Sequence, residues 1–139
     1  MVLTAQPIKV GPFILPNRFV MGSMHTGLEG HQDKFDQLAK FYADRSSGGT
    51  ALVITGGFSP NFQGRIKDEH CTIETKKDII AHKIITSAVH DAGGRILLQL
   101  LHAGRYGYHS HQVAPSPQKS PINRESPKEL TGVEITQTI

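Results

Sequence analysis

The stretch "RILLQLLHAGRYGY", residues 95–108, begins like a buried strand and then changes character. Three apolar residues precede Gln99, and His102 follows after two leucines. A buried amide without a partner costs about 1–3 kcal/mol, so Gln99 needs a group with which to form hydrogen bonds. Glutamine carries donors and an acceptor side by side, which suits a flat heterocycle that presents a carbonyl next to an N–H. The end of this strand is therefore a candidate binding site.

The segment before this strand repeats a pattern found earlier in the chain. Apolar residues at helical spacing in 33–47 are followed by Gly48–Gly49 and by the apolar run "TALVITGG" at 50–57. The same spacing in 78–92 is followed by Gly93–Gly94 and then by the strand quoted above. Each pattern predicts an amphipathic helix that ends at glycines and leads into a buried strand.

The sequence also predicts where the helices begin. Asp33 and Asp78 stand where side chains can cap the first and second helices. Ser126 and Pro127 predict the start of a third helix, with the serine as cap and the proline at the first helical position. Between the third strand and this helix, residues 109–125 are rich in proline, serine and charge, which predicts a long surface loop.

Three buried strands are expected, near 18–23, 51–55 and 95–100. Their centres are separated by about 33 and 44 residues, which suits strand–helix–strand crossovers of the right-handed kind. Strands with little polar alternation are covered on both faces or closed into a barrel. We therefore predict a parallel α/β fold with both helices on the outer face. The side chains expected on the inner face are those of Val20, Val53 and Leu97.

Glycine and polar residues follow each predicted strand at its carboxyl end. The sets are Gly22-Ser23-Met24-His25-Thr26-Gly27, Thr55-Gly56-Gly57, and Gln99 with His102-Ala103-Gly104-Arg105. Taken singly, each set also fits turn glycines and a satisfied core histidine. Ligands of parallel α/β folds bind outside the carboxyl ends of the strands, and three such sets favour a site there. The amide of Gln99 matches the pyrimidine edge of a flavin, and the glycines allow backbone to approach such a ring closely.

The composition argues against several other classes of protein. The formal net charge is +3, but the basic residues are scattered, so nucleic-acid binding is not expected. No apolar span of about 20 residues predicts a membrane helix, and the N-terminus does not read as a secretory leader. The single cysteine, Cys71, excludes an intramolecular disulfide and fits a reducing compartment, so a cytoplasmic protein is expected.

Other motifs carry less weight. The "HSH" at 109–111 is a weak candidate for metal binding, because two loop histidines without a third ligand more often face solvent, and no metal site is predicted. Fingerprints for Rossmann-type dinucleotide binding, for a P-loop and for a serine nucleophile elbow are missing.

Two motifs together resemble the old yellow enzyme family of flavin-dependent oxidoreductases. "LPNRFVMGSMHTG" at 15–27 is similar to that family's N-terminal strand, and "LLQLLHAGRY" at 97–106 to its third-strand motif. The similarity runs over essentially all 139 residues. The version "SMHTGLE" at 23–29 looks most like the branch that contains bacterial 2,4-dienoyl-CoA reductase.

The resemblance implies a (β/α)8 TIM barrel that binds FMN at the carboxyl ends of its strands. It places cofactor contacts at Ser23, Met24, His25, Gly57 and Gln99, with Gln99 on the pyrimidine edge of the ring. The implied reaction moves a hydride from NAD(P)H through FMN to an activated C=C bond of a small molecule. An enone or an enoyl thioester such as 2,4-dienoyl-CoA would be the acceptor. Two further motif residues, His102 and Arg105, match the family without an assigned role.

A complete barrel needs eight strands and about 250 residues, whereas three strands are predicted here. We therefore expect residues 1–139 to form the N-terminal portion of the barrel, about three βα units, and to be inactive alone. Catalytic residues, and any iron–sulfur cluster or FAD, are expected only downstream. Exposed inner faces predict self-association. The alternatives are a truncated, non-catalytic remnant or interaction fragment, and a complete flavodoxin-like domain, which would need about five strands.

Overall fold

The computed structural model describes residues 2–138, which fold into two compact units. The first, here called the strand–helix unit, comprises Met1–Gly57 and Ile80–Gln99. The second, the loop unit, comprises Phe58–Ile79 and Leu100–Ile139.

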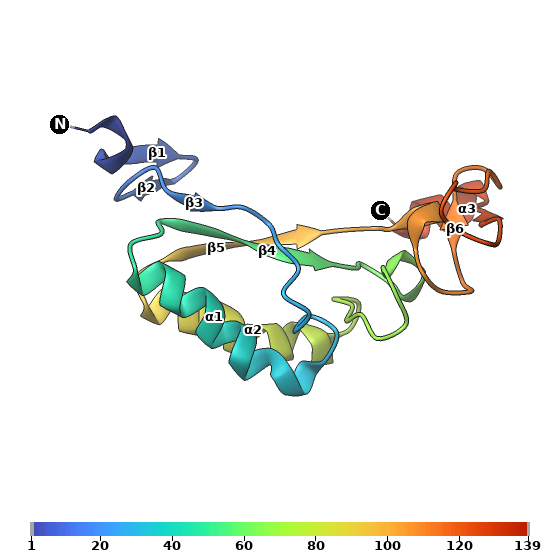
Figure 1. The fold of residues 1–139 in the computed structure, drawn as a ribbon, viewed down its shortest axis with the longest axis horizontal. Coiled ribbons are helices and arrows are strands. Elements are labelled where there is room, and N and C mark those ends of the chain that lie inside the picture. Colours follow the sequence, from blue (N-terminus) through green and yellow to red (C-terminus); the bar gives the residue numbers. More distant parts are fainter. Residues whose placement is uncertain (1, 139) are drawn as a thin grey trace. The chain divides into compact units, whose positions relative to one another are not determined.

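A three-stranded sheet in the order β3-β4-β5 forms the centre of the strand–helix unit. Its strands are β3 (Val20–Met21), β4 (Leu52–Phe58) and β5 (Arg95–Leu100). β3 pairs with β4 in parallel, with Val20 opposite Leu52. The arrows of β4 and β5 point the same way in Figure 1, so the predicted parallel arrangement is confirmed. β3 is shorter than the predicted strand at 18–23.

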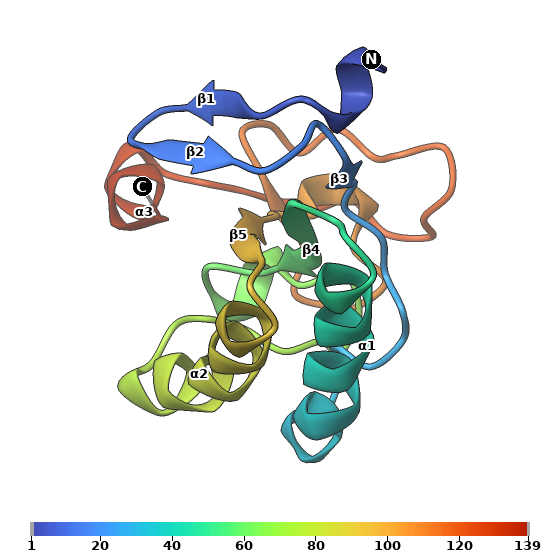
Figure 2. The ribbon, with the colours of Figure 1, turned by 90° about the vertical axis from the view of Figure 1, so that its left-hand side faces the viewer.

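Two helices, α1 (Phe35–Ser47) and α2 (Lys76–Asp91), lie on the same face of this sheet, as Figures 1 and 2 show. Both occupy nearly the predicted ranges. α1 buries its predicted apolar stripe, with Phe35, Leu38 and Tyr42 fully buried. α2 fully buries Ile85 and Val89, whereas Ile84, which the spacing also placed on the buried face, is 47% exposed. No helix within residues 2–138 is long and apolar enough to cross a membrane.

The predicted helix caps are wrong by a few residues. The cap of α2 is formed by Thr75, whose N–H donates to Asp78 Oδ2 (2.9 Å) and whose Oγ1 accepts from the Asp78 N–H (3.2 Å). This reciprocal pair is a capping box, in which Asp78 is the third residue of the helix rather than its cap. Asp33 lies in a short 3₁₀ turn, Gln32–Lys34, and Lys34 precedes α1 without a side-chain cap.

One of the three predicted inner-face residues is also misplaced. Val53 is fully buried, and in the register of the sheet it is paired with Met21, whereas Val20 is paired with Leu52. Since successive side chains of a strand point to opposite faces, Val53 belongs to the face that the helices cover. Val20, paired with Leu52, lies on the opposite face from Val53 as predicted, and its side chain is 50% exposed. The inner-face position of Leu97 stays a prediction.

An antiparallel hairpin precedes the sheet and was not predicted. It consists of β1 (Ile8–Val10) and β2 (Phe13–Leu15), paired in register. Gly11 turns the chain between them at a φ of 55°, a conformation that glycine adopts without steric cost. Three-residue strands are too short to show the alternation on which strand prediction depends.

The loop unit contains short elements separated by irregular chain. They are the 3₁₀ turns Phe62–Gly64 and Gly104–Tyr106, the parallel pair β6 (Val113–Ala114) and β7 (Lys128–Glu129), and α3 (Gly132–Thr138). The predicted helix start at Ser126 and Pro127 is wrong, because residues directly after them are extended. The Lys128 N–H donates to the Gln112 carbonyl (2.9 Å), and α3 begins only after Thr131.

The predicted surface loop is partly buried. Asn123 Nδ2 donates to the carbonyls of Arg105 (2.5 Å) and Gly107 (3.0 Å), and Gln112 Nε2 donates to the Gly107 carbonyl (2.5 Å). Asn123, Gln112 and Ser120 are all at least nine-tenths buried. Side chains that bond to backbone therefore hold this segment in place, and its polar composition reflects internal hydrogen bonds as well as exposure to water.

Candidate cofactor-binding site

The carboxyl ends of the three strands are joined by hydrogen bonds centred on Gln99. The Ser23 hydroxyl donates to Gln99 Oε1 at 2.7 Å, across 76 residues of sequence. The backbone N–H of Gln99 donates to Thr55 Oγ1 at 3.1 Å. Ser23 follows β3, Thr55 lies in β4 and Gln99 in β5, so one residue links all three strand ends.

These bonds orient the amide of Gln99. Its oxygen is turned toward Ser23, which leaves its nitrogen as the end that can meet a ligand. Within the described part of the chain, no group accepts a hydrogen bond from Gln99 Nε2, and the side chain is half-buried. Because the oxygen of the Gln99 amide is engaged and its N–H groups are available, the amide can donate a hydrogen bond to a ligand carbonyl.

The glycines at the end of β4 bring other segments close to its backbone. The Gly56 N–H donates to the phenolic oxygen of Tyr42 at 3.0 Å, from the buried face of α1. A Cβ atom added at Gly56 would lie 2.9 Å from the carbonyl oxygen of Met24, so the segment after β3 lies directly against β4. Gly57, the next residue, is buried.

Burial raises the pKa of the Tyr42 phenol, and the charge of Glu29 raises it further, while the hydrogen bond from Gly56 acts in the opposite direction. Tyr42 therefore stays a neutral hydroxyl at physiological pH. Its contribution at the site is to satisfy a backbone donor that would otherwise be buried without a partner.

The structure places the five predicted cofactor contacts at the carboxyl ends of the strands. Ser23 and Gln99 are bonded to each other, and the Met24 backbone lies against Gly56. The side chains of Met24 and His25 are exposed. These five residues can bind and orient a planar group, whereas redox chemistry would have to come from that group.

Two residues beside this site, Tyr42 and Glu29, were not predicted from the sequence. Tyr42 was interpreted only as part of an apolar stripe, and its hydroxyl contact with Gly56 has no sequence signal. Glu29 is 1% exposed and accepts hydrogen bonds from Thr26. The spacing Thr26-x-x-Glu29 is that of a capping box and could have drawn attention to this pair.

His102 and Arg105 belong to the loop unit and serve its own turns. His102 Nδ1 accepts from the Gly104 N–H (3.2 Å), and the Arg105 guanidinium donates to the Tyr106 hydroxyl (3.3 Å). Burial lowers the pKa of His102, and the nearby His109 lowers it further, so the neutral ring is favoured. Both contacts lie within the loop unit, and Nε2 of His102 is buried with no hydrogen-bond partner among the described residues.

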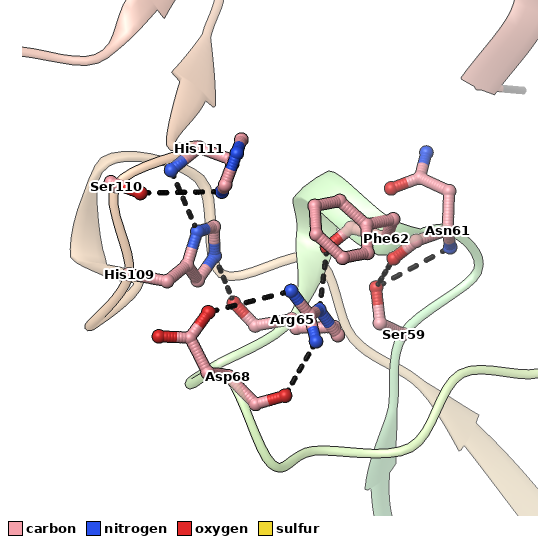
Figure 3. A network of polar contacts seen from close by, with 8 residues as sticks. All are labelled: Ser59, Asn61, Phe62, Arg65, Asp68, His109, Ser110 and His111. Atoms are coloured by element: carbon pink, nitrogen blue, oxygen red, sulfur yellow. Dashed lines mark hydrogen bonds and ion pairs between the residues drawn. The ribbon is translucent and has the colours of Figure 1, made fainter.

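The "HSH" motif is tied into a hydrogen-bond network, which Figure 3 shows. His109 is buried and its Nε2 lies 2.8 Å from the Arg65 carbonyl oxygen, while its Nδ1 accepts from the His111 N–H (3.2 Å). Arg65 in turn stacks over the ring of Phe62, 3.8 Å from the centroid. Because both ring nitrogens of His109 are engaged, this histidine is a structural residue and unsuited to metal binding.

A family model described as "NADH:flavin oxidoreductase / NADH oxidase family" matches residues 5–139. The chain belongs to this family. The resemblance to the old yellow enzymes, which the two strand motifs indicated, is thereby confirmed at the level of the family.

Two proteins with similar sequences are longer than this chain. A metal reductase of Desulforamulus reducens is 32% identical over 145 residues, which covers 100% of this chain and 21% of the reductase. An NADPH dehydrogenase of Bacillus subtilis is 29% identical over 138 residues, which covers 96% of this chain and 40% of that protein. The chain therefore spans between a fifth and two-fifths of these relatives.

Solved structures share the fold. A 2-naphthoyl-CoA reductase in complex with 2-naphthoyl-CoA matches 97% of this chain, and 23% of its own, with a TM-score of 0.87 at 21% identity. The old yellow enzyme from Pichia sp. AKU4542 matches 98% of this chain, and 39% of its own, with a TM-score of 0.82 at 24% identity. The predicted fold class, an α/β part of a (β/α)8 barrel, is confirmed.

Proposed function

We propose that this chain forms the flavin-ring side of an FMN site in an NAD(P)H-dependent oxidoreductase. In this proposal, residues 1–139 are the N-terminal portion of the FMN-binding barrel domain. The observation that carries it is the bonded set of Ser23, Thr55 and Gln99, which presents an amide donor at the carboxyl ends of the strands. Membership of the NADH:flavin oxidoreductase family supports it.

The residues fit an isoalloxazine ring. Gln99 Nε2 would donate to a carbonyl of the pyrimidine edge, and the backbone near Ser23 and Met24 would lie by the reactive nitrogen. Gly57 would allow close approach of the ring, and His25 would lie beside it. When bound, FMN supplies the capacity to accept and release a hydride, while the protein contributes orientation and electrostatics.

The chain's own contribution is to fix the donor before the cofactor arrives. Ser23 holds the amide oxygen, and Thr55 holds the backbone of β5 at Gln99. In (β/α)8 barrels the phosphate site is typically built after strands seven and eight. We accordingly place the anchoring of the FMN phosphate, and the catalytic acid, in sequence outside residues 1–139.

The proposed electron donor is NADH or NADPH, and the proposed acceptor is an activated C=C bond of an enone or enoyl thioester. 2,4-dienoyl-CoA is the specific acceptor suggested by "SMHTGLE" at 23–29. The 2-naphthoyl-CoA reductase that shares this fold was solved with a CoA thioester bound, which supports an acceptor of this class. We also propose a cytoplasmic location. The proposal further includes an iron–sulfur cluster and FAD, carried by other parts of the protein.

A non-catalytic interaction fragment is the second candidate. It is favoured by the exposed apolar side chains of β5, where Leu97, Leu98 and Leu100 are 53%, 40% and 61% exposed. The two candidates differ in whether the protein takes up FMN. Residues 1–139 produced alone are expected to self-associate and to retain no stoichiometric FMN under either candidate.

The deciding experiment measures FMN binding and flavin potential in the full-length protein and in Gln99→Leu. Loss of the amide donor should weaken FMN binding by about five- to 150-fold, the equivalent of the 1–3 kcal/mol for an unpaired polar group. It should also make the flavin harder to reduce, because a donor to the reduced ring is lost. Gln118→Leu, at an exposed position, is the matched control.

Two results would count against the proposal. A full-length protein that binds no FMN would favour the interaction fragment. An unchanged FMN dissociation constant together with an unchanged reduction potential in Gln99→Leu would remove Gln99 from the site. Anaerobic reduction of the bound flavin by NADH and by NADPH, followed by addition of an enone or 2,4-dienoyl-CoA, then identifies donor and acceptor.

A further inference from the structure

Glu29 is a buried carboxylate in the segment between β3 and α1. It is 1% exposed, and its two oxygens accept from the Thr26 N–H at 2.9 and 3.1 Å. The Thr26 hydroxyl donates to Oε1 (2.9 Å), and the Gly27 N–H donates to Oε2 (3.0 Å). One carboxylate thus collects the polar hydrogens of a tight turn directly after Ser23, Met24 and His25.

The environment of Glu29 favours the ionised form. Burial by itself raises the pKa of the carboxyl, but the hydrogen bonds from backbone and from the Thr26 hydroxyl outweigh it, with a further contribution from His25. The net pKa is lowered. A charged acceptor strengthens each of these bonds, so the turn is held more firmly than one closed by neutral groups.

The carboxylate also lies against bare backbone of β4. A Cβ atom at Gly56 would be 2.7 Å from Glu29 Oε1 and 2.9 Å from the Met24 carbonyl oxygen. Glu29 and Met24 therefore occupy the space that any side chain at Gly56 would need. This packing fixes the turn against the strand whose next residue is Gly57.

We propose that Glu29 is a positioning residue for the cofactor site, which holds the segment 23–27 so that Ser23, Met24 and His25 meet the flavin ring. The inference rests on the proposed FMN site. Glu29 acts through Thr26 and Gly27 and through its contact with β4, and it does not itself touch the ring.

The test uses the full-length protein with the variants Glu29→Gln and Thr26→Val, and Glu125→Gln as the matched control at an exposed position. Amide hydrogen exchange without FMN reports on the turn. FMN binding and the reduction potential of the bound flavin report on the site. Melting temperature separates a local effect from general loss of stability.

In Glu29→Gln the acceptor loses its charge, so the amides of Thr26 and Gly27 should exchange about tenfold faster and FMN should bind about tenfold more weakly. Each tenfold change corresponds to about 1.4 kcal/mol. The amide of Gly56, bonded to Tyr42, should keep its protection. Thr26→Val removes one of the four bonds to Glu29, and the acceptor of the Leu28 N–H, and should show the same pattern to a smaller degree. Glu125→Gln should leave every readout unchanged.

The outcomes are distinct. Faster exchange at Thr26 and Gly27 with unchanged FMN affinity and flavin potential would overturn the positioning role and leave the proposed function intact. Failure of the unmodified protein to bind FMN would overturn the proposed function and this inference with it. Should Glu29→Gln fail to fold, unchanged FMN binding in a folded Thr26→Val would overturn the inference.

Discussion

Each of the two units of this chain is stabilised internally by a different kind of interaction. In the strand–helix unit the fully buried side chains are mainly apolar, among them Leu38 and Val53. In the loop unit the buried set is largely polar, and Arg65, His109 and Asn123 bond to backbone carbonyls.

This difference decides how each unit responds to a single substitution. Apolar burial depends on volume and on the area removed from water, and it has no direction. A hydrogen bond to a given carbonyl depends on the position of one donor, and its net contribution is smaller. Substitutions in the two units should therefore differ in size and in what they disturb.

The largest effect is expected in the strand–helix unit. Leu38→Ala removes a fully buried side chain of α1 and should lower the free energy of unfolding by about 3 kcal/mol, from lost burial and the cavity left behind. Ile80→Ala, at a position 65% exposed on α2, is the control and should change it by less than about 0.5 kcal/mol. Urea denaturation of the protein measures both. Equal losses would show that the unit is not held by its apolar stripe.

A smaller effect is expected in the loop unit. Asn123→Ala removes the donor to the Arg105 and Gly107 carbonyls, and should lower the free energy of unfolding by about 1–2 kcal/mol. Gln118→Ala, on the same segment but exposed, should be close to neutral. Proteolysis under native conditions checks the local effect, since cleavage between 105 and 125 should become faster. A loss as large as that of Leu38→Ala would erase the distinction between the units.

The smallest effect is expected at the surface, next to α3. The hydrogen bond from Lys128 lowers the pKa of Glu134 to about 2, together with bonds from the Thr131 N–H and hydroxyl. Because the folded pKa lies below the unfolded one, this contribution is present above about pH 4.3 and is lost as the pH falls toward 2. An NMR titration should show the low pKa, and Lys128→Gln should raise it. If the pKa of Glu134 is the same in Lys128→Gln as in the unmodified protein, the hydrogen bond between Lys128 and Glu134 is refuted.

The predictions that held concern patterns repeated along contiguous residues, and those that failed concern short elements or contacts between backbone and side chain. The stripes of α1 and α2 and the parallel strands were predicted because helical and strand periodicities are local and repeat over many residues. The hairpin at Ile8–Leu15 and the pair β6–β7 were missed, because strands of two or three residues leave no periodicity to read. Asp78 was interpreted as a cap because the sequence shows only that an acidic residue stands near a helix start, and the reciprocal bond to Thr75 depends on backbone geometry.

By itself, the sequence determined the class of fold and the family. It also determined that polar residues follow three parallel strands, because apolar spacing and short motifs are properties of contiguous residues. Only the tertiary structure decided that the Ser23 hydroxyl holds the oxygen of Gln99, that Glu29 and Met24 fill the space beside Gly56, and that Val53 faces the helices. Each of these depends on distances of a few ångströms between segments far apart in the chain, and such distances are set by the packing of the whole unit.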